Sequence, residues 1–166
     1  MSLVIRQSTP ADIDVILALR DTAREIMRQC GNVNQWPEGY PAKSKFESDI
    51  AGGVSYIVEN DGKPVATFAL IPSPDPTYAK VYDGPGWRNH DEEYGVIHRI
   101  ASDGSCRGIF NAALDFAKSR FSDMRIDTHT DNVIMRHSLV KHGFVEVGTI
   151  ILANGEPRVA YQWIKD

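Results

Sequence analysis

The feature that most constrains the fold is an apolar segment followed by a polar, glycine-containing turn and an amphipathic segment. The apolar segment, residues 94–101 (YGVIHRIA), has the length and composition of a buried strand. The turn at residues 102–107 leads into residues 108–120, where apolar side chains recur at the spacing of one helix face. A strand, a turn and a helix in this order predict a helix packed against a sheet.

The remaining sequence shows the same two patterns. Thr9-Pro10-Ala11-Asp12 combines a capping residue, a first-turn proline and an acid at the capping-box position, which marks a helix start. Residues 72–93 are rich in Pro, Gly and polar residues, and so long a loop in a compact domain is usually functional or mobile. Helices are expected at 9–30, 42–50, 108–120 and 132–142, and strands at 3–5, 54–59, 64–71, 94–101, 124–128, 144–152 and 158–164.

The bulk properties indicate one soluble domain over residues 1–166. A length of 166 residues suits a single core, and there are no internal repeats and no second hydrophobic block. A net charge of −4 argues against a nucleic-acid partner. No apolar run is long enough for a membrane span, and the first residues do not resemble a signal peptide, so no membrane association and a cytoplasmic location are expected.

The turn before residues 108–120 has the elements of an anion site. A helix N-terminus presents unpaired backbone N–H groups and the positive end of the helix dipole. Gly104 and Gly108 let the backbone approach a ligand such as a pyrophosphate closely. On these residues alone, two interpretations stay open: the turn binds an anion, or it only reverses the chain, as many such turns do.

Residues 94–162 resemble the GNAT superfamily of N-acetyltransferases, and the element order matches that fold along the whole chain. In that family a turn of the form Arg/Gln-x-x-Gly-x-Gly/Ala wraps the pyrophosphate of CoA. The aligned segment here is Ser105-Cys106-Arg107-Gly108-Ile109-Phe110. Gly108 is retained, whereas Ser105 replaces the long polar residue and Phe110 replaces the second small one.

Further segments carry the same resemblance. Asn132 and the later Gly143-Phe144 are similar to the family's segment in which an asparagine holds the CoA arm. Residues 125–129, residues 158–162 and Gln35-Trp36-x-x-x-Tyr40-Pro41 resemble a bacterial subgroup. The resemblance implies a mixed α/β (α+β) fold, with a mostly antiparallel sheet of about seven strands and about four flanking helices. It implies acetyl-CoA as cosubstrate, bound by Ile100, Ala101, Ser105, Cys106, Arg107, Gly108, Ile109, Phe110, Asn111 and Asn132.

The catalytic groups are less obvious. The family often uses a tyrosine acid at the position that is Leu139 here, and a leucine cannot transfer a proton. His98, on the strand beside the predicted thioester, is the candidate base, although a packed structural histidine is an equal alternative. Glu92 and Glu93 could act through water, and Tyr161 on the last strand could reach the thiol. Arg99 is expected to point away from His98 and to form an ion pair.

The acceptor pocket is expected where the fold places it, lined by Gln35, Trp36, Tyr40 and His129. The histidines at positions 90, 98, 129, 137 and 142 lack the spacing of a metal site, so no metal is expected. The chain is therefore predicted to be a bacterial-type enzyme that transfers acetyl from acetyl-CoA to a primary amine of a small molecule or peptide, by direct attack in a ternary complex.

Two alternatives remain. Leu139 and Phe110 would suit a CoA-binding sensor or interaction module without catalysis. An unrelated nucleotide-binding α/β protein would bind ATP or NAD. Family members commonly form homodimers, so a homodimer is one expected state.

Overall fold

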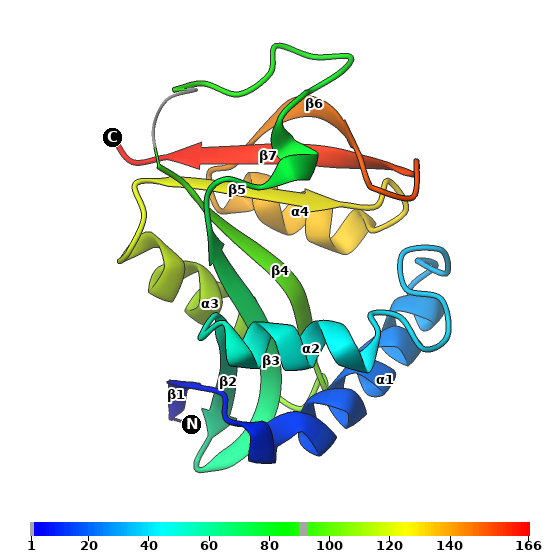
Figure 1. The fold of residues 1–166 in the computed structure, drawn as a ribbon, viewed down its shortest axis with the longest axis vertical. Helices are drawn as coiled ribbons and strands as arrows, with labels where there is room; N and C mark the ends of the chain where they lie inside the picture. The colour runs from blue at the N-terminus through cyan, green and yellow to red at the C-terminus, as the bar shows by residue number, and fades with distance from the viewer. Residues whose placement is uncertain (1, 90–92) are drawn as a thin grey trace.

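The computed structural model describes residues 2–89 and 93–166. Glu92, one of the acids considered above, lies outside the described residues. A single seven-stranded sheet runs through the molecule in the order β1-β2-β3-β4-β5-β7-β6 (Figure 1). The strands are β1 (Leu3–Gln7), β2 (Ser55–Asn60), β3 (Lys63–Pro72), β4 (Gly95–Ser102), β5 (Asp123–Thr128), β6 (Val145–Ile151) and β7 (Pro157–Ile164).

The sheet is mixed and mostly antiparallel, as predicted. The β4–β5 pair is parallel, and every other pair of neighbouring strands is antiparallel. The helices are α1 (Ile13–Gln29), α2 (Lys43–Ala51), α3 (Ile109–Lys118) and α4 (Val133–Lys141). The expected α/β fold with about seven strands and about four helices is thereby confirmed.

Local signals explain where the first helix begins. Residues Pro10–Asp12 form a short 3-10 turn that continues into α1. The backbone N–H of Thr9 donates to the Asp12 carboxylate at 2.7 Å, which is the reciprocal half of a capping box. The predicted helix start is therefore correct to within a turn.

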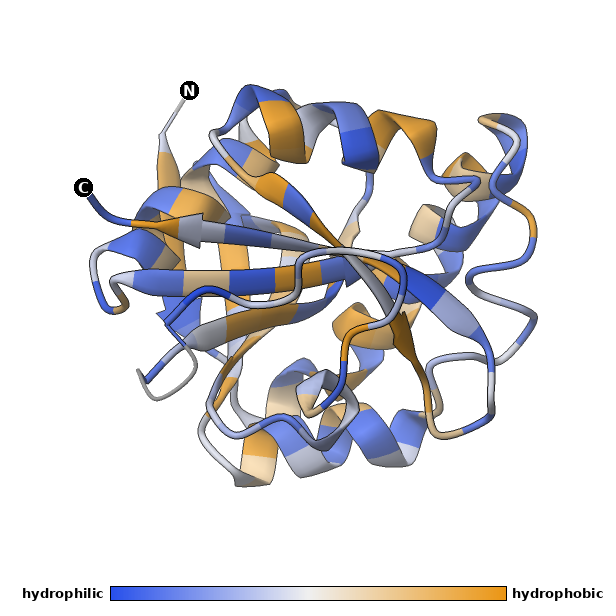
Figure 2. Cartoon of the chain, turned by 90° about the horizontal axis from the view of Figure 1, so that it is seen from above, coloured by the Kyte–Doolittle hydropathy of each residue, from blue (hydrophilic) through white to orange (hydrophobic). Residues whose placement is uncertain are grey.

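The helices cover the two faces of the sheet in pairs. Helices α1 and α2 pack on β2, β3 and β4, around Ile16, Phe46 and Ile57. Helices α3 and α4 share the largest core cluster, where Ala113 and Leu139 are fully buried. Figure 2 shows the apolar residues interleaved with polar ones along these elements, as expected of layers that bury one face. No helix in the described part of the chain is long and apolar enough to cross a membrane.

The long segment after β3 has a fixed course over residues 73–89. Tyr78 and Trp87 are buried and pack with Val147 of β6 in a second core cluster. The backbones of Tyr82 and Thr149 exchange two hydrogen bonds of 2.8 and 2.7 Å. This segment, named the β3–β4 segment below, is therefore held against β6 and β7.

Candidate active site

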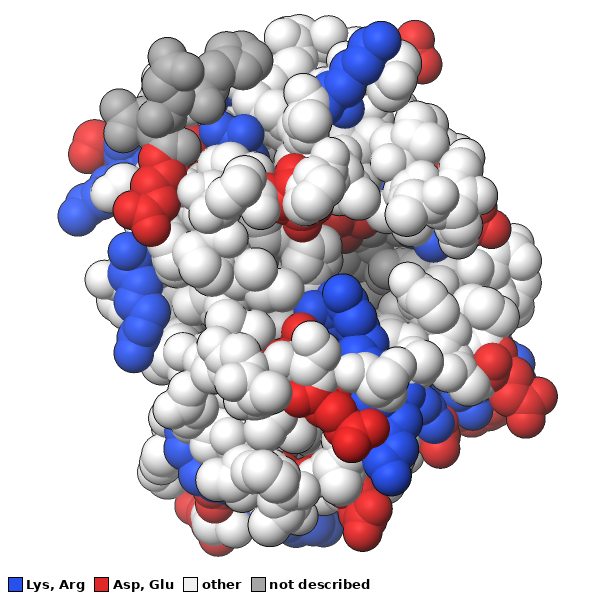
Figure 3. Space-filling view, in the orientation of Figure 1, with Lys and Arg blue, Asp and Glu red and all other residues white. Residues whose placement is uncertain are grey.

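The sheet opens between its two middle strands. Strand β4 pairs with β5 only at Gly95–Met124 and Val96–Arg125, and the two strands diverge beyond these pairs (Figure 1). A cleft of about 690 Å³ lies at the opening, lined by both strands, α2, α4 and the segments that follow α1 and β3. Figure 3 shows a hollow near the middle of this face, with acidic atoms along its upper rim and basic atoms below it.

A bulge in β4 shapes one wall of the cleft. Thr67 pairs with Ala101 and Ala69 with His98, so Phe68 faces two residues of β4. Arg99 is one of the two, and its φ of 54° lies in the left-handed region. The bulge interrupts the alternation of side chains.

Both His98 and Arg99 therefore line the cleft, which corrects the expectation that they point in opposite directions. The expected ion pair of Arg99 exists. Its guanidinium makes two hydrogen bonds, of 2.7 and 2.8 Å, to the buried carboxylate of Asp49 on α2. This bidentate pair holds the bulge against α2.

His98 has a carboxylate partner that comes from the β3–β4 segment. Its Nε2 atom lies 2.8 Å from Oδ2 of Asp75. Burial alone would raise the pKa of Asp75, but hydrogen bonds from His98 and Thr77 outweigh it and lower that pKa to about 2. Asp75 is thus ionised at neutral pH and accepts a hydrogen bond from Nε2 of His98, so in the neutral ring the nitrogen without a hydrogen is Nδ1.

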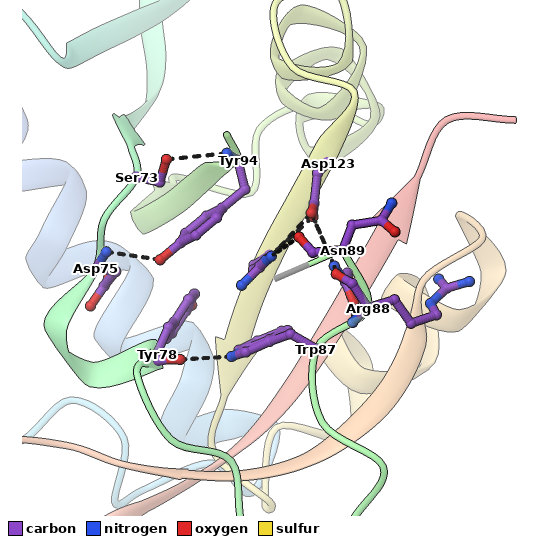
Figure 4. A network of polar contacts seen from close by, with 10 residues as sticks. Ser73, Asp75, Tyr78, Trp87, Arg88, Asn89, Tyr94 and Asp123 are labelled. Atoms are coloured by element: carbon purple, nitrogen blue, oxygen red, sulfur yellow. Dashed lines mark hydrogen bonds and ion pairs between the residues drawn. The ribbon is translucent and has the colours of Figure 1, made fainter. Parts of the chain in front are cut away.

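A network of aromatic and charged side chains fixes the position of Asp75 (Figure 4). The backbone N–H of Asp75 donates to the hydroxyl of Tyr94 at 2.9 Å. The Arg125 guanidinium lies 3.9 Å from the Tyr94 ring centroid and 4.8 Å from that of Trp87, and it pairs with the buried Asp123 at 3.1 Å. The Trp87 indole N–H donates to the carbonyl of Tyr78 at 2.7 Å. The segment is therefore anchored on both sides of Asp75.

The loop between α1 and α2 closes another side of the cleft. The side-chain oxygen of Gln35 accepts hydrogen bonds from Asn32 at 2.9 Å, Asn132 at 3.0 Å and Thr128 at 3.3 Å. Asn132 also caps α4, because its Oδ1 accepts from the N–H of Met135 at 3.2 Å. Gln35 and Asn132 thus both line the cleft, although their side-chain groups are engaged with protein partners.

The other expected pocket residues differ in position. Trp36 and Tyr40 line the cleft, Trp36 being buried against Leu19 and Ala23 while Tyr40 is exposed. His129 is not among the residues that line the cleft. Its Nδ1 accepts a hydrogen bond from the N–H of Asp131 at 3.0 Å, within the turn after β5.

The expected acid on the last strand is not brought to His98. Tyr161 is 2% exposed and does not line the cleft among the described residues. Its hydroxyl accepts from Nε of Arg136 at 3.1 Å and donates to Glu146 at 3.5 Å. Leu139 is fully buried in the main core, so its position on α4 serves packing.

The turn before α3 has a free helix terminus. Gly108 precedes α3 with a left-handed φ of 84°, and nothing lies within 4 Å of a Cβ built there. The first N–H groups of α3 have no helical partner. Other N–H groups of the turn are occupied: that of Ser105 donates to Asp103 at 2.9 Å, and that of Gly104 to Ser102 at 3.1 Å.

The residues expected to bind acetyl-CoA are divided between the cleft and its surroundings. Ile100, Phe110 and Asn132 line the cleft, whereas Ala101 and Ile109 are buried in the core. The Phe110 ring packs edge-on against His142, with 5.7 Å between ring centroids. The rest of the turn and the start of α3 are exposed or half-buried at Ser105, Cys106, Arg107, Gly108 and Asn111.

Sequence reasoning missed Asp75 and Tyr78 as neighbours of the site, whereas it considered Asp127, with His129, either as a group that orients a partner or as a structural polar residue. Asp75 stands in a long segment without a motif, and only its place on the folded chain brings it to His98. No group of His, Cys, Asp or Glu suited to a metal ion occurs within the described residues.

Comparisons with known proteins agree with this architecture. The chain is 32% identical to an acetyltransferase of the GNAT family from Streptococcus agalactiae, over 99% of this chain and 96% of that chain, with a TM-score of 0.87. It is 26% identical to a candidate acetyltransferase from Staphylococcus aureus, over 97% and 98% of the two chains, with a TM-score of 0.67. A GNAT acetyltransferase from Listeria monocytogenes, 18% identical, shares the fold with a TM-score of 0.72 over 98% and 94%.

No protein-family model matches the sequence, and no curated protein matches it either. The Streptococcus agalactiae protein nevertheless resembles this chain in sequence and in structure along almost all of both lengths. The opening between β4 and β5, with a free helix N-terminus beyond it, is therefore that of an acyltransferase enzyme, and the chain belongs to the GNAT family of acetyltransferases.

Proposed function

We propose that this enzyme transfers the acetyl group of acetyl-CoA to a primary amine of a small molecule or peptide, by direct attack in a ternary complex. The observation that carries the proposal is the contact between His98 and Asp75 at 2.8 Å, inside a cleft of about 690 Å³ that opens between β4 and β5. A base held by a carboxylate is the group that can take the proton an attacking amine loses as it bonds to the acetyl carbon.

The residues around the cleft suit acetyl-CoA as the acetyl donor. The free N–H groups at the start of α3 and the open space at Gly108 fit the pyrophosphate of CoA. Ile100, Phe110 and Asn132 line the cleft itself. Bound there, the donor supplies an acetyl group activated as a thioester.

His98 carries the proton step. With Nε2 donating to Asp75, Nδ1 takes the proton that the amine loses as its nitrogen bonds to the acetyl carbon and the carbon–sulfur bond breaks. The departing thiolate gains one proton, so the reaction as a whole moves one proton from amine to thiol. Tyr40 is the tyrosine that lines the cleft among the described residues, and its side chain is 44% exposed. In the proposed mechanism, water therefore supplies the proton that the departing thiolate gains.

The test is to incubate the protein with acetyl-CoA and a panel of primary amines and to follow the free thiol. The expected result is release of CoA that depends on an amine, with mass spectrometry showing one acetyl group on the amine. Binding of CoA without turnover on a broad panel would instead indicate a CoA-binding module.

A further inference from the structure

Among the described residues, one carboxylate of the cleft has no cationic partner. Asp127, on β5, lines the cleft across from β4. Its Oδ1 accepts a hydrogen bond from the hydroxyl of Tyr78 at 2.6 Å. Within residues 2–89 and 93–166, no Lys, Arg or His side chain forms an ion pair with it.

The other acids and guanidinium groups around the cleft are matched in charge. Asp75 pairs with His98, and Arg99 pairs with Asp49. Arg158 of β7, which also lines the cleft, pairs with Glu156 at 3.3 Å. Lys45 on α2 lines the cleft as well and is exposed, but it makes no ion pair with Asp127.

The hydroxyl of Tyr78 holds the Asp127 carboxylate in position. Tyr78 is 2% exposed, and burial, followed by the charge of Asp127, raises its pKa well above that of an ordinary tyrosine. The hydroxyl therefore stays protonated and donates to one carboxylate oxygen, while the other oxygen keeps its capacity to accept.

The same tyrosine places Asp127 near the reacting end of the cleft. The ring centroids of Tyr78 and His98 are 6.2 Å apart, and the Tyr78 hydroxyl contacts Asp127. A partly buried carboxylate without a counter-charge is costly, and a cation that entered the cleft would relieve that cost. One short molecule could present an amine to His98 and a second cation to Asp127.

We propose that Asp127 binds a second cationic group of the acceptor, so that the enzyme prefers diamines or similar dications to monoamines of the same length. The proposal rests on the proposed acetyl transfer to an amine. Trp36 and Tyr40, which also line the cleft, offer an aromatic surface for the chain that joins the two cationic groups.

The experiment compares putrescine with butylamine, which has the same carbon chain and one amino group fewer. The wild-type kcat/KM is expected to favour putrescine at least about tenfold, the preference that one charge-assisted contact supplies. Asp127→Asn keeps an oxygen for Tyr78 to donate to but removes the charge, so the ratio of the two kcat/KM values should fall to about two or less. Asp14→Asn removes the same charge at an exposed site on α1 and should leave the ratio as in the wild type.

A wild-type ratio near one, or an unchanged ratio in Asp127→Asn, would overturn the proposal. Calorimetric titration of putrescine into the CoA-loaded protein distinguishes a failure of the Asp127 proposal from a failure of the proposed acetyl transfer. If no amine is acetylated, the acetyl-transfer proposal fails, yet weaker putrescine binding in Asp127→Asn than in the wild type still supports the role of Asp127. Equal binding to both proteins, or no binding to either, counts against it.

Discussion

At the scale of single residues, the proposed chemistry of the cleft assigns different tasks to the two ring nitrogens of His98. Asp75 accepts from Nε2 of His98 at 2.8 Å and so directs Nδ1 as the proton acceptor. A packed structural histidine could also take a carboxylate partner, but this pair lies in the cleft that opens between β4 and β5. The pair therefore favours the catalytic reading of His98 over the structural one.

Replacing His98 should affect turnover much more than donor binding. His98→Ala is expected to lower kcat at saturating acetyl-CoA by about a hundredfold or more, the usual contribution of a general base. The CoA dissociation constant should stay within about twofold, because the expected pyrophosphate turn follows the C-terminal end of β4 and does not include His98. Steady-state kinetics and calorimetry check the two quantities. An unchanged kcat would remove His98 from the mechanism.

A second residue-scale prediction concerns the turn before α3. Asp103 places a carboxylate on the Ser105 N–H at 2.9 Å, beside the expected pyrophosphate. Asp103→Ala frees this donor and removes a like charge, so CoA should bind about fivefold more tightly, corresponding to about 1 kcal/mol. Ser102→Ala frees the Gly104 N–H without a change of charge and should have a smaller effect. Weaker CoA binding in Asp103→Ala would mean that the pyrophosphate lies elsewhere.

At the scale of elements, the site depends on how the β3–β4 segment is seated. Its first part carries Asp75 and Tyr78, and its later part packs on β6 and β7. The buried pair of Arg125 and Asp123, with the ring of Tyr94, connects these parts to β5 (Figure 4). Secure packing of a long segment explains why a residue from it can serve as a fixed partner of His98.

Crowding the contact between the β3–β4 segment and β6 should therefore impair both stability and activity. A Cβ at Gly84 would lie 2.3 Å from the carbonyl oxygen of Val147, so the segment must shift away from β6. Gly84→Ala is expected to cost about 1–3 kcal/mol of unfolding free energy and to lower kcat through displacement of Asp75.

Gly86→Ala is the matched control, because nothing lies within 4 Å of its Cβ and only its φ of 81° is strained. It should lower the unfolding free energy less and leave kcat closer to that of the wild type. Chemical denaturation and steady-state kinetics measure both effects. Equal losses in the two variants would show that crowding against β6 is not the cause.

At the scale of the whole molecule, two ionised carboxylates, Asp12 and Asp75, are expected to make the stability of the fold depend on acid. Hydrogen bonds from Arg6 lower the pKa of Asp12 to about 2, and those from His98 and Thr77 outweigh burial and lower the pKa of Asp75 to about 2. Both pKa values lie below the ordinary value of 3.8 for an aspartate, so each carboxylate stabilises the fold above about pH 4.

That stability should be lost as the pH falls from about 4 towards 2. Each group contributes at most about 2 kcal/mol, and less where solvent screens its charge. Denaturant unfolding at several pH values is the measurement. In a variant with Asp12→Asn and Asp75→Asn the decline over this window should be shallower, and an unchanged slope would contradict the assignment to these carboxylates.

Much of this architecture follows from short-range patterns, and some of the site does not. The helix start at Thr9–Asp12 and the strand, turn and helix around Gly108 depend on residues close in sequence, so capping rules and periodicity predict them. The Arg99 bulge gave no such signal. A local pattern predicts alternation along β4, and only pairing with β3 reveals the extra residue.

The sequence alone determined the order of elements, the mixed α/β layers and the glycine turn before α3, because these depend on local propensity and periodicity. Only the tertiary structure decided which polar groups meet. Asp75 is 23 residues from His98, and Gln35 is 97 residues from Asn132, yet each pair is in hydrogen-bond contact. Tyr161, which from the sequence could have reached the thiol, is buried and contacts Arg136 and Glu146. Such contacts depend on strand order, register and the course of a long segment, and no local pattern encodes these.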